Sequence, residues 1–345
     1  MRFLLRQRQA ARLFFPRRSC YAGFVALEHI TVRLARPADA QRIALMSRDL
    51  IEYGLGWSWQ ADRVLRLVVE LDGETVVNVA PDIGYLHRCA EKIGENLTAR
   101  QWIPYTDRMD YLAAMNMNLG WALTVEKLMR HQVGERARHL RVLIAELNRI
   151  ASHLLGMGAY GLDLGTFSPF LYAFREREKI LDLFESLTGA RMMCNYMRFG
   201  GCRCDLPPGW VEAAKKVVAE YPRFLDEFET LLSGNEILMA RTQGVGKVSA
   251  ELAVNAGLTG PMLRASGVDY DLRKVDKYGF YPRFDFRVPL GDHGDVFDRY
   301  MIRILEMRES LKILQQALRD IPVGPIIDPK AKLRGFRPKA GEAYG

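Results

Sequence analysis

The sequence contains no hydrophobic run of 18 or more residues, so no stretch of it is predicted to cross a bilayer as a helix. Cysteine is scarce, with five in 345 residues, which excludes a disulfide-stapled framework and favours a reducing compartment. No CxxC or HxxxH pair occurs, and Cys202 and Cys204 alone offer too few ligands. We therefore expect no intrinsic metal and no iron–sulfur cluster.

Acidic residues are absent from the first 20 positions, which carry six arginines. Those arginines account for most of the formal net charge of +8 and leave +2 for the other 325 residues. The body is thus nearly neutral, and no nucleic-acid partner is expected. Residues 1–29 have the composition of a mitochondrial presequence. The alternative interpretation is upstream sequence read from a mis-assigned start codon.

Residues 30–63 differ in pattern from the rest of the chain. An alternating strand (Ile30, Val32, Leu34) precedes an amphipathic helix around residues 43–51, an order that resembles the opening of GNAT-type acetyltransferases. No acetyl-CoA loop follows, so the segment is interpreted as a fusion or assembly scar. An acetyltransferase would reveal itself by thermal protection with acetyl-CoA.

From residue 64 onward the pattern is mainly helical. Two alternating apolar runs in 64–79 flank Asp72 and Gly73, which is the chemistry of a hairpin turn. Apolar residues recur at helical spacing in five later stretches, 111–129, 138–157, 170–187, 207–232 and 296–318, whereas 244–261 is rich in loop residues. The expected fold class is α+β, mainly helical, with a small N-terminal β region.

Ionisable side chains gather in residues 81–111, a segment that ends with Asp107, Arg108, Asp110 and Tyr111. So many charges between apolar anchors would need mutual pairing if they were buried. Two interpretations stay open for this segment. One is a polar network at a cleft, and the other is a structural mesh of salt bridges.

A second polar pattern lies within the stretch 138–157. Glu146, Arg149 and His153 follow one another at spacings of three and four, which places them on one helix face. His153 is interpreted as a satisfied buried histidine rather than as a ligand.

From about Val64 to the C-terminus the sequence resembles the D subunit of respiratory complex I, which is the quinone-site subunit of NADH:quinone oxidoreductase. The resemblance covers about four fifths of the chain. It is carried by GYLHRCAEK (84–92), IPYTDRMDYL (103–112), IAELNRIASHLLGMGAYGLDLGTFSPFLYAFREREKILDLFESLTGAR (144–191), NYMRFGGC (195–202), GLTGPMLRASGVDYDLRK (257–274) and GDVFDRYMIRILEMRES (294–310). That family is related in fold to the large subunit of [NiFe]-hydrogenases, which implies a hydrogenase-like helical bundle. The cysteine pairs that hold nickel are absent, so hydrogen chemistry is excluded.

The resemblance also implies roles for individual residues. Tyr111 matches the tyrosine at the quinone headgroup, and Asp163 matches an aspartate that pairs with a quinone-site histidine. Arg88 matches an arginine beside the terminal iron–sulfur cluster, which belongs to the neighbouring B subunit. Cofactor binding is thus assigned to His87, Arg88 and Tyr111, and catalysis to Tyr111 and Asp163. A phenol keeps its proton at neutral pH and can donate it to a carbonyl oxygen that gains negative charge.

The resemblance further implies a substrate, partners and a location. The substrate is a quinone (ubiquinone or menaquinone), NADH is used by the whole complex, and electron transfer is coupled to proton translocation. The implied partners are the iron–sulfur B subunit, the C subunit and the membrane quinone-channel subunit. The expected location is peripheral, on the cytoplasmic side of a bacterial inner membrane, with the matrix side of the mitochondrial inner membrane as the alternative. Residues 64–325 form the domain that resembles this family, and 326–345 are expected to be a truncated tail.

Some positions depart from the family pattern. The stretch LGWSWQADR (55–63) stands where the family has GPQHPSTHG, so Asp62 replaces the quinone-site histidine and would repel Asp163. Met193 replaces a second histidine beside the cluster, and Cys89 replaces a glycine. These departures leave an alternative open, in which the chain is a non-catalytic or truncated scaffold form of the same subunit.

Overall fold

The computed structural model describes residues 66–329 and 340–344. The chain divides after Arg88 into two compact units. The strand and helix predicted within residues 30–63, together with Asp62, lie outside the described residues.

The first unit contains the predicted hairpin. Strands β1 (Arg66–Asp72) and β2 (Thr75–Asp82) pair antiparallel. Because Asp72 pairs with Thr75, Gly73 and Glu74 form the two-residue turn, and Gly73 has the positive φ of 62° that such a turn favours. The hairpin predicted for residues 64–79 is therefore confirmed.

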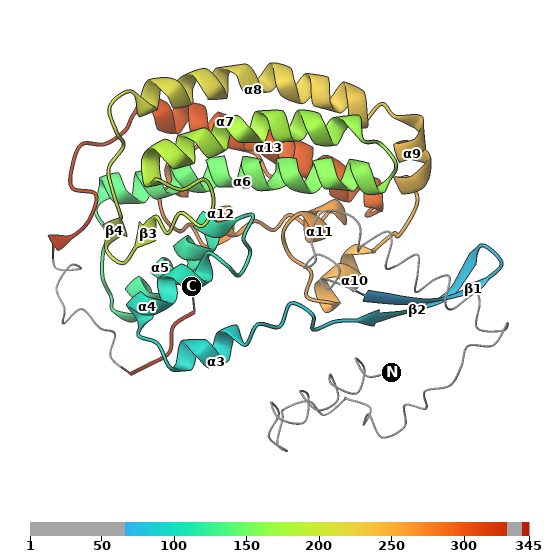
Figure 1. Ribbon diagram of the computed structural model, residues 1–345, viewed down its shortest axis with the longest axis horizontal. Coiled ribbons are helices and arrows are strands. Elements are labelled where there is room, and N and C mark those ends of the chain that lie inside the picture. Colours follow the sequence, from blue (N-terminus) through green and yellow to red (C-terminus); the bar gives the residue numbers. More distant parts are fainter. Residues whose placement is uncertain (1–65, 330–339, 345) are drawn as a thin grey trace, which may run out of the picture. The chain divides into compact units, whose positions relative to one another are not determined.

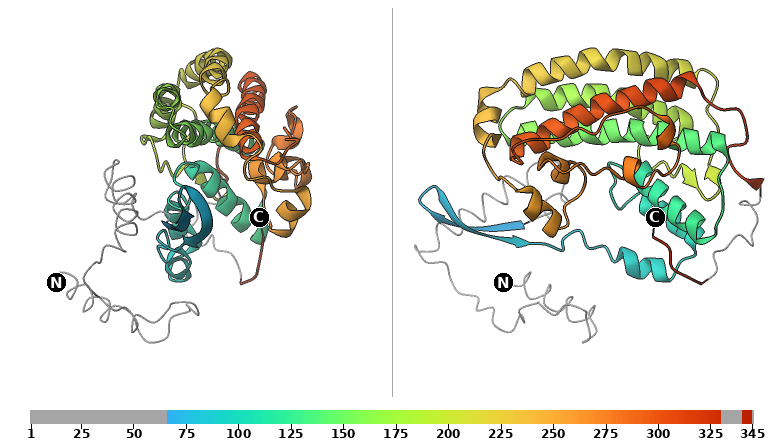
Figure 2. Two further views of the ribbon diagram at one scale, coloured as in Figure 1. Left: turned by 90° about the vertical axis from the view of Figure 1, so that its right-hand side faces the viewer. Right: turned by 180° about the vertical axis from the view of Figure 1, so that it is seen from behind.

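Four long helices form the core of the second unit: α6 (Glu135–Asp163), α7 (Ser168–Thr188), α8 (Trp210–Leu232) and α13 (Val296–Arg319). Helix α6 packs against α7 and α13, and α8 packs against the same two helices, as Figure 1 shows. The end-on view in Figure 2 shows them as one bundle. The prediction of a mainly helical α+β fold is confirmed.

Helix α6 is buried along most of its length. The apolar stripe predicted for it is confirmed, since Leu143, Leu147, Ile150 and Leu154 are each at most 1% exposed. The helix continues past the predicted end at residue 157 in spite of its glycines. At Gly158 a Cβ atom would lie 3.0 Å from the Ala173 Cβ, so this glycine lets α7 approach closely.

Shorter helices surround the bundle. They are α3 (Ala90–Glu95), α4 (Ala99–Thr106), α5 (Ala114–Leu128), α9 (Glu236–Thr242), α10 (Ala250–Asn255), α11 (Gly260–Ala265), α12 (Leu272–Val275) and the 3-10 helix η4 (Tyr281–Arg283). The prediction of a loop over 244–261 was wrong in part, because α10 lies inside it and α11 begins there. The Ser249 side chain caps α10, and Pro261 opens α11. Across the described ranges, no helix is both long and apolar enough to traverse a bilayer.

A two-stranded element holds part of the C-terminal segment. Strands β3 (Met197–Arg198) and β4 (Gly201–Cys202) pair with each other, and Gly201 also forms a β-bridge with Ile327. The Cys202 amide donates to the Ile326 carbonyl at 2.8 Å. The predicted tail is therefore ordered at its start, where it extends this sheet.

Replacing Gly201 by alanine is expected to lower the free energy of unfolding by about 2–3 kcal/mol. The new Cβ would lie 2.0 Å from the Ile326 carbonyl oxygen and 2.7 Å from the Ile327 Cα, so the C-terminal segment would have to move. Urea unfolding of the full chain measures the change. The matched control is Gly156→Ala in α6, where a Cβ meets no atom within 4 Å. This control should gain about 0.5–1 kcal/mol. Equal midpoint urea concentrations for the unfolding of the two variants would contradict the prediction.

Candidate functional site

Tyr111 lies in the turn between α4 and α5. Helix α4 begins with a capping box made by Thr98 and Gln101, and the chain leaves it at Asp107. The Asp110 carboxylate then accepts hydrogen bonds from the Leu112 amide at 3.2 Å and the Ala113 amide at 3.3 Å. The turn leaves the Tyr111 side chain 39% exposed. A phenol on a surface turn is able to meet a ligand from outside the chain.

Helix α6 holds this turn in place through one buried amide. The Asn148 side chain donates to the Leu112 carbonyl and accepts from the Met115 amide, both at 3.0 Å. Because one side chain fixes the backbone on both sides of the α5 start, the position of Tyr111 depends on the bundle core.

Asp107, four residues before Tyr111, is fully buried. Neither carboxylate oxygen has a hydrogen-bond partner. Burial raises the pKa of Asp107 to about 6, although the Arg108 guanidinium, 3.7 Å away, acts to lower it. Arg108 is itself half-exposed and donates to the Pro104 carbonyl at 2.8 Å.

Asp163 is the last residue of α6 and is exposed. Partial burial raises the pKa of its carboxyl. It lies fifteen positions after Asn148, which corresponds to an axial rise of about 22 Å along the helix. Asp163 thus lies at the end of α6, and Tyr111 lies on the turn that Asn148 anchors. No hydrogen bond or ion pair joins the two predicted residues within the described ranges.

His87 and Arg88 belong to the first unit, whereas Tyr111 and Asp163 belong to the second. Both side chains are exposed, and the His87 amide donates to the Gly84 carbonyl at 2.9 Å. Cys89, where the family pattern has glycine, adopts a left-handed conformation with φ 56° and ψ 32°. Glycine, which stands here in the family pattern, adopts that conformation without strain, whereas a cysteine rarely does.

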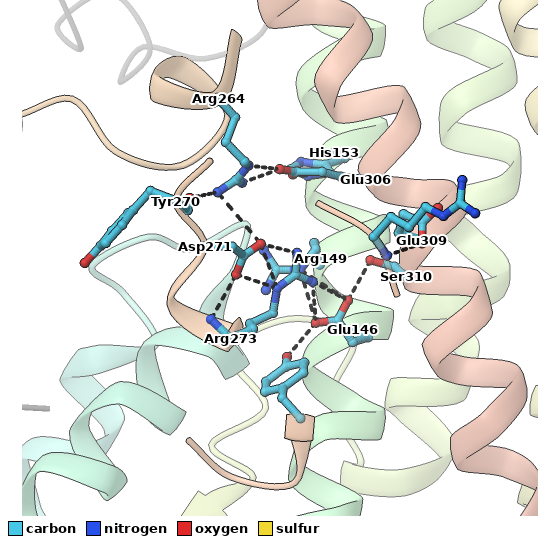
Figure 3. A network of polar contacts seen from close by, with 12 residues as sticks. Glu146, Arg149, His153, Arg264, Tyr270, Asp271, Arg273, Glu306, Glu309 and Ser310 are labelled. Atoms are coloured by element: carbon cyan, nitrogen blue, oxygen red, sulfur yellow. Dashed lines mark hydrogen bonds and ion pairs between the residues drawn. The ribbon is translucent and has the colours of Figure 1, made fainter. Parts of the chain in front are cut away.

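A buried ionic network joins α6 and α13 to the segment that contains α11 and α12 (Figure 3), outside residues 81–111. Its centre is Glu146 on α6, which is fully buried. The Glu146 carboxylate accepts from the Tyr281 hydroxyl at 2.5 Å, the Ser310 hydroxyl at 2.6 Å and Arg149 Nε at 3.2 Å. Arg273 Nη1 lies 3.4 Å from it. Burial acts to raise the pKa of Glu146, but Arg149 and Arg273 overcome this and hold that pKa at about 2.

A second carboxylate, Glu306 on α13, continues the network. It accepts from His153 Nε2 at 2.8 Å and pairs with Arg264. Arg264 also lies 3.8 Å from Asp271, which pairs with Arg273 at 2.7 Å and so links the two halves. Burial lowers the pKa of His153, although Glu306 acts to raise it. His153, interpreted from the sequence as a satisfied buried histidine, pairs with Glu306 and is partly buried.

The sequence indicated only part of this network. The spacing of Glu146, Arg149 and His153 placed them on one face, but the residues that pair with them come from segments more than 100 positions later. Within 81–111, Lys92 pairs locally with Glu95 at 2.5 Å, and Asp82 pairs with Arg66 across the hairpin at 3.6 Å. The buried charge of that segment is Asp107, which neither interpretation had singled out.

The cysteines of the second unit are free thiols. Cys194 and Cys202 are buried, and burial raises the pKa of each thiol, that of Cys202 to about 11. In the portion that the structure describes, no three histidine, cysteine, aspartate or glutamate side chains are grouped so that they could hold a metal ion.

Comparison with known proteins gives consistent matches. A family model described as the 49 Kd subunit of respiratory-chain NADH dehydrogenase matches residues 163–342. The D subunit of NADH-quinone oxidoreductase from Desulforamulus reducens is 53% identical over 282 residues, which cover 81% of this chain and 76% of that protein. The counterpart from Methylacidiphilum infernorum is 52% identical over 276 residues, which cover 80% of this chain and 66% of that protein. The D 2 subunit from Chloroflexus aurantiacus is 47% identical over 307 residues, which cover 81% of this chain and 75% of that protein. The matched region thus spans about two thirds to three quarters of these relatives.

Proposed function

The chain belongs to the family of the respiratory-chain NADH dehydrogenase 49 Kd subunit, whose relatives are named as the D subunit of NADH-quinone oxidoreductase, and we propose that it forms the quinone-reduction site of that enzyme. It is therefore part of a multi-subunit, membrane-associated oxidoreductase of the respiratory chain. In the proposed role it binds a quinone beside the terminal iron–sulfur cluster of the B subunit, and the reduction is coupled to proton translocation.

The exposure and anchoring of Tyr111 carry this proposal. Reduction of a quinone to a quinol takes two electrons and two protons, and each carbonyl oxygen becomes a hydroxyl. A hydrogen-bond donor held at one carbonyl stabilises the negative charge that develops there. Tyr111 is such a donor, exposed to an incoming ligand and fixed to α6 by Asn148. Positioning of this kind removes the entropy cost of orienting the donor during the reaction.

We propose a different role for Asp163. It is a carboxyl at the C-terminal end of a long helix, where the helix dipole adds to burial in favouring the protonated form. In the proposed role it holds or releases a proton for the reaction at the C-terminal end of α6. His87 and Arg88 are proposed to face the cluster and the quinone, where a guanidinium favours the reduced cluster by charge attraction.

The proposed partners follow from the same role. The iron–sulfur B subunit supplies the electrons, the C subunit docks beside this chain, and a membrane subunit brings the quinone to the site. The proposed location is the face of the membrane on which NADH is oxidised, cytoplasmic in a bacterium and matrix in a mitochondrion.

A scaffold form of the same subunit is the second candidate. The observation that favours it is the replacement of family residues near the site by Met193 and Cys89, both with positive φ of 56°. The Met193 thioether cannot donate a proton as an imidazole does, and Cys89 lacks the conformational freedom of the glycine that it replaces.

Rapid mixing of the assembled complex with NADH separates the two candidates. A working quinone site should give cluster reduction followed by quinol formation, with both rates recorded in one experiment by electron paramagnetic resonance and by quinone absorbance. Cluster reduction without quinol formation, in a complex that contains this chain, would contradict the proposed catalytic role and support the scaffold. The control is an artificial electron acceptor that does not use the quinone site, which should be reduced in either case.

A further inference from the structure

A group of buried oxygen atoms around Asp107 lacks hydrogen-bond donors. Both Asp107 carboxylate oxygens have no partner, and neither do the side-chain carbonyl oxygens of Asn118 and Asn195. Unpaired buried polar atoms cost free energy and are rare in folded proteins, so four unpaired acceptors in one region need a physical explanation.

The neighbouring amides are only weak donors to Asp107. Hydrogen bonding from the Asn195 backbone and the Asn118 side chain acts to lower the pKa of Asp107, but neither contact has the geometry of an ordinary hydrogen bond, and together they do not offset burial. The Asn118 side-chain NH₂ group already donates to the Ile103 carbonyl at 3.2 Å and to Thr106 Oγ1 at 2.7 Å. Both amide hydrogens thus have better-placed acceptors than the Asp107 carboxylate, and the Asn118 side-chain carbonyl oxygen has no donor.

Titratable groups face Asp107 from its own turn and from the segment that contains β3. Arg108, on the same turn, lies 3.7 Å away, and Arg198 on β3 adds a weaker attraction. The buried Cys194 thiol, just before β3, is also near, and the Asp107 charge adds to burial in raising the pKa of that thiol. Burial outweighs the two guanidinium groups, which leaves the ionised form of Asp107 disfavoured.

We propose that Asp107 binds a proton, donates it in a hydrogen bond to one of the amide oxygens around it, and thereby acts as a positioning residue for Tyr111. A protonated carboxyl has one O–H donor, which is the atom type that this region lacks. When the proton leaves, a charge remains buried without hydrogen bonds, and the turn from Asp107 to Ala113 loosens. The effect on Tyr111 rests on the proposed quinone site, whereas proton binding by Asp107 does not.

The direction of the pH dependence follows from the pKa of Asp107, which rises from 3.8 to about 6 on folding. An acid whose folded pKa is raised binds its proton more tightly in the folded state. Its favourable effect on folding is present below pH 3.8 and is lost as the pH rises to about 6. The shift corresponds to a change of about 100-fold in the folding constant over that range.

Asp107→Asn tests proton binding in the full chain by urea unfolding at several pH values. Asparagine has the shape of the protonated acid and supplies donors at every pH. The folding constant of Asp107→Asn relative to the unmodified chain should therefore rise about 100-fold between pH of about 4 and about 7. The matched control is Asp110→Asn on the same turn, which removes an exposed charge and keeps the acceptor oxygen that forms the turn. A ratio for Asp107→Asn that stays constant with pH, or that changes no more than the ratio for Asp110→Asn, would overturn the proposal.

Quinone turnover by the assembled complex tests the link to Tyr111. The ratio of turnover by Asp107→Asn to turnover by the unmodified enzyme should increase with pH, with a midpoint near the pKa of Asp107, about 6. A residue that only stabilises the fold would change turnover by a constant factor. If the ratio is independent of pH while the unfolding ratio changes, Asp107 binds a proton without positioning Tyr111, and that half of the proposal fails. If the unmodified complex does not turn over quinone, the proposed function fails and the unfolding result still decides on Asp107.

Discussion

Replacing Tyr111 by phenylalanine is expected to lower quinone turnover by the assembled complex about 100-fold, the usual size of an effect when one donor to a developing negative charge is removed. Phenylalanine keeps the ring and removes only the hydroxyl, so the turn held by Asp110 and Asn148 should be unchanged. The loss should appear in kcat rather than in KM, because the donor matters most in the transition state. Steady-state kinetics with a short-chain quinone measure it.

Tyr105→Phe is the matched control for this variant. Tyr105 lies on α4, is 41% exposed and stacks on Trp102 with ring centroids 5.1 Å apart. It has nearly the same exposure as Tyr111 and no proposed role, so its replacement should leave turnover within about twofold, as for most surface substitutions. Turnover by Tyr111→Phe equal to that of the control would remove the support for a quinone site at this turn.

The helical part of the fold could be predicted because each long helix carries its own apolar pattern. The stripe through Leu143, Leu147 and Leu154 indicated α6, and all three residues are buried. Helix α6 extends to Asp163 through two glycines that pack closely, Gly158 against Ala173 of α7 and Gly161 against Leu232 of α8. A contact of that kind is not visible in a local pattern. Helices α10 and α11 were missed for a similar reason, since six-residue helices contain too few turns to show a period.

The candidate site could be predicted only in part. Composition and spacing indicated polar residues in 81–111, but the particular role of Tyr111 came from the resemblance to a family. Burial of Asp107 could not be predicted, because it depends on contacts with Asn118 and with the segment around Asn195. These residues are 11 and 88 positions away, and only the tertiary fold brings them together.

The network around Glu146 shows the same limit. Its α6 members stand at helical spacing, but Arg273, Tyr281 and Ser310 arrive from segments 127 to 164 positions later. No local pattern in the sequence reports which distant arginine will neutralise a buried carboxylate.

Replacing Glu146 by glutamine is expected to lower the free energy of unfolding by about 3–5 kcal/mol. Glutamine keeps the size of the side chain and one acceptor oxygen for the Ser310 hydroxyl, but it removes the charge. Arg149 and Arg273 are then left near each other without the carboxylate that separates them, and a buried charge without its partner is costly. Urea unfolding of the full chain at neutral pH measures the loss.

Glu185→Gln is the control, because it removes the same charge from an exposed ion pair. Glu185 lies on α7 and pairs with Arg191 at 3.1 Å, with both side chains open to solvent. Screening by water limits that pair to less than about 1 kcal/mol. A loss for Glu146→Gln no larger than for this control would contradict a stabilising role of the network.

Acid should reproduce the Glu146→Gln result in the unmodified chain. The folded pKa of Glu146 is held at about 2, below its ordinary value of 4.5, so its contribution is fully present above pH 4.5 and is lost as the pH falls towards 2. The difference in unfolding free energy between the unmodified chain and Glu146→Gln should therefore narrow over that interval, because protonation removes the same charge that the substitution removes. A difference that stayed constant down to pH of about 2 would mean that the arginines are satisfied by another anion and that Glu146 acts through packing alone.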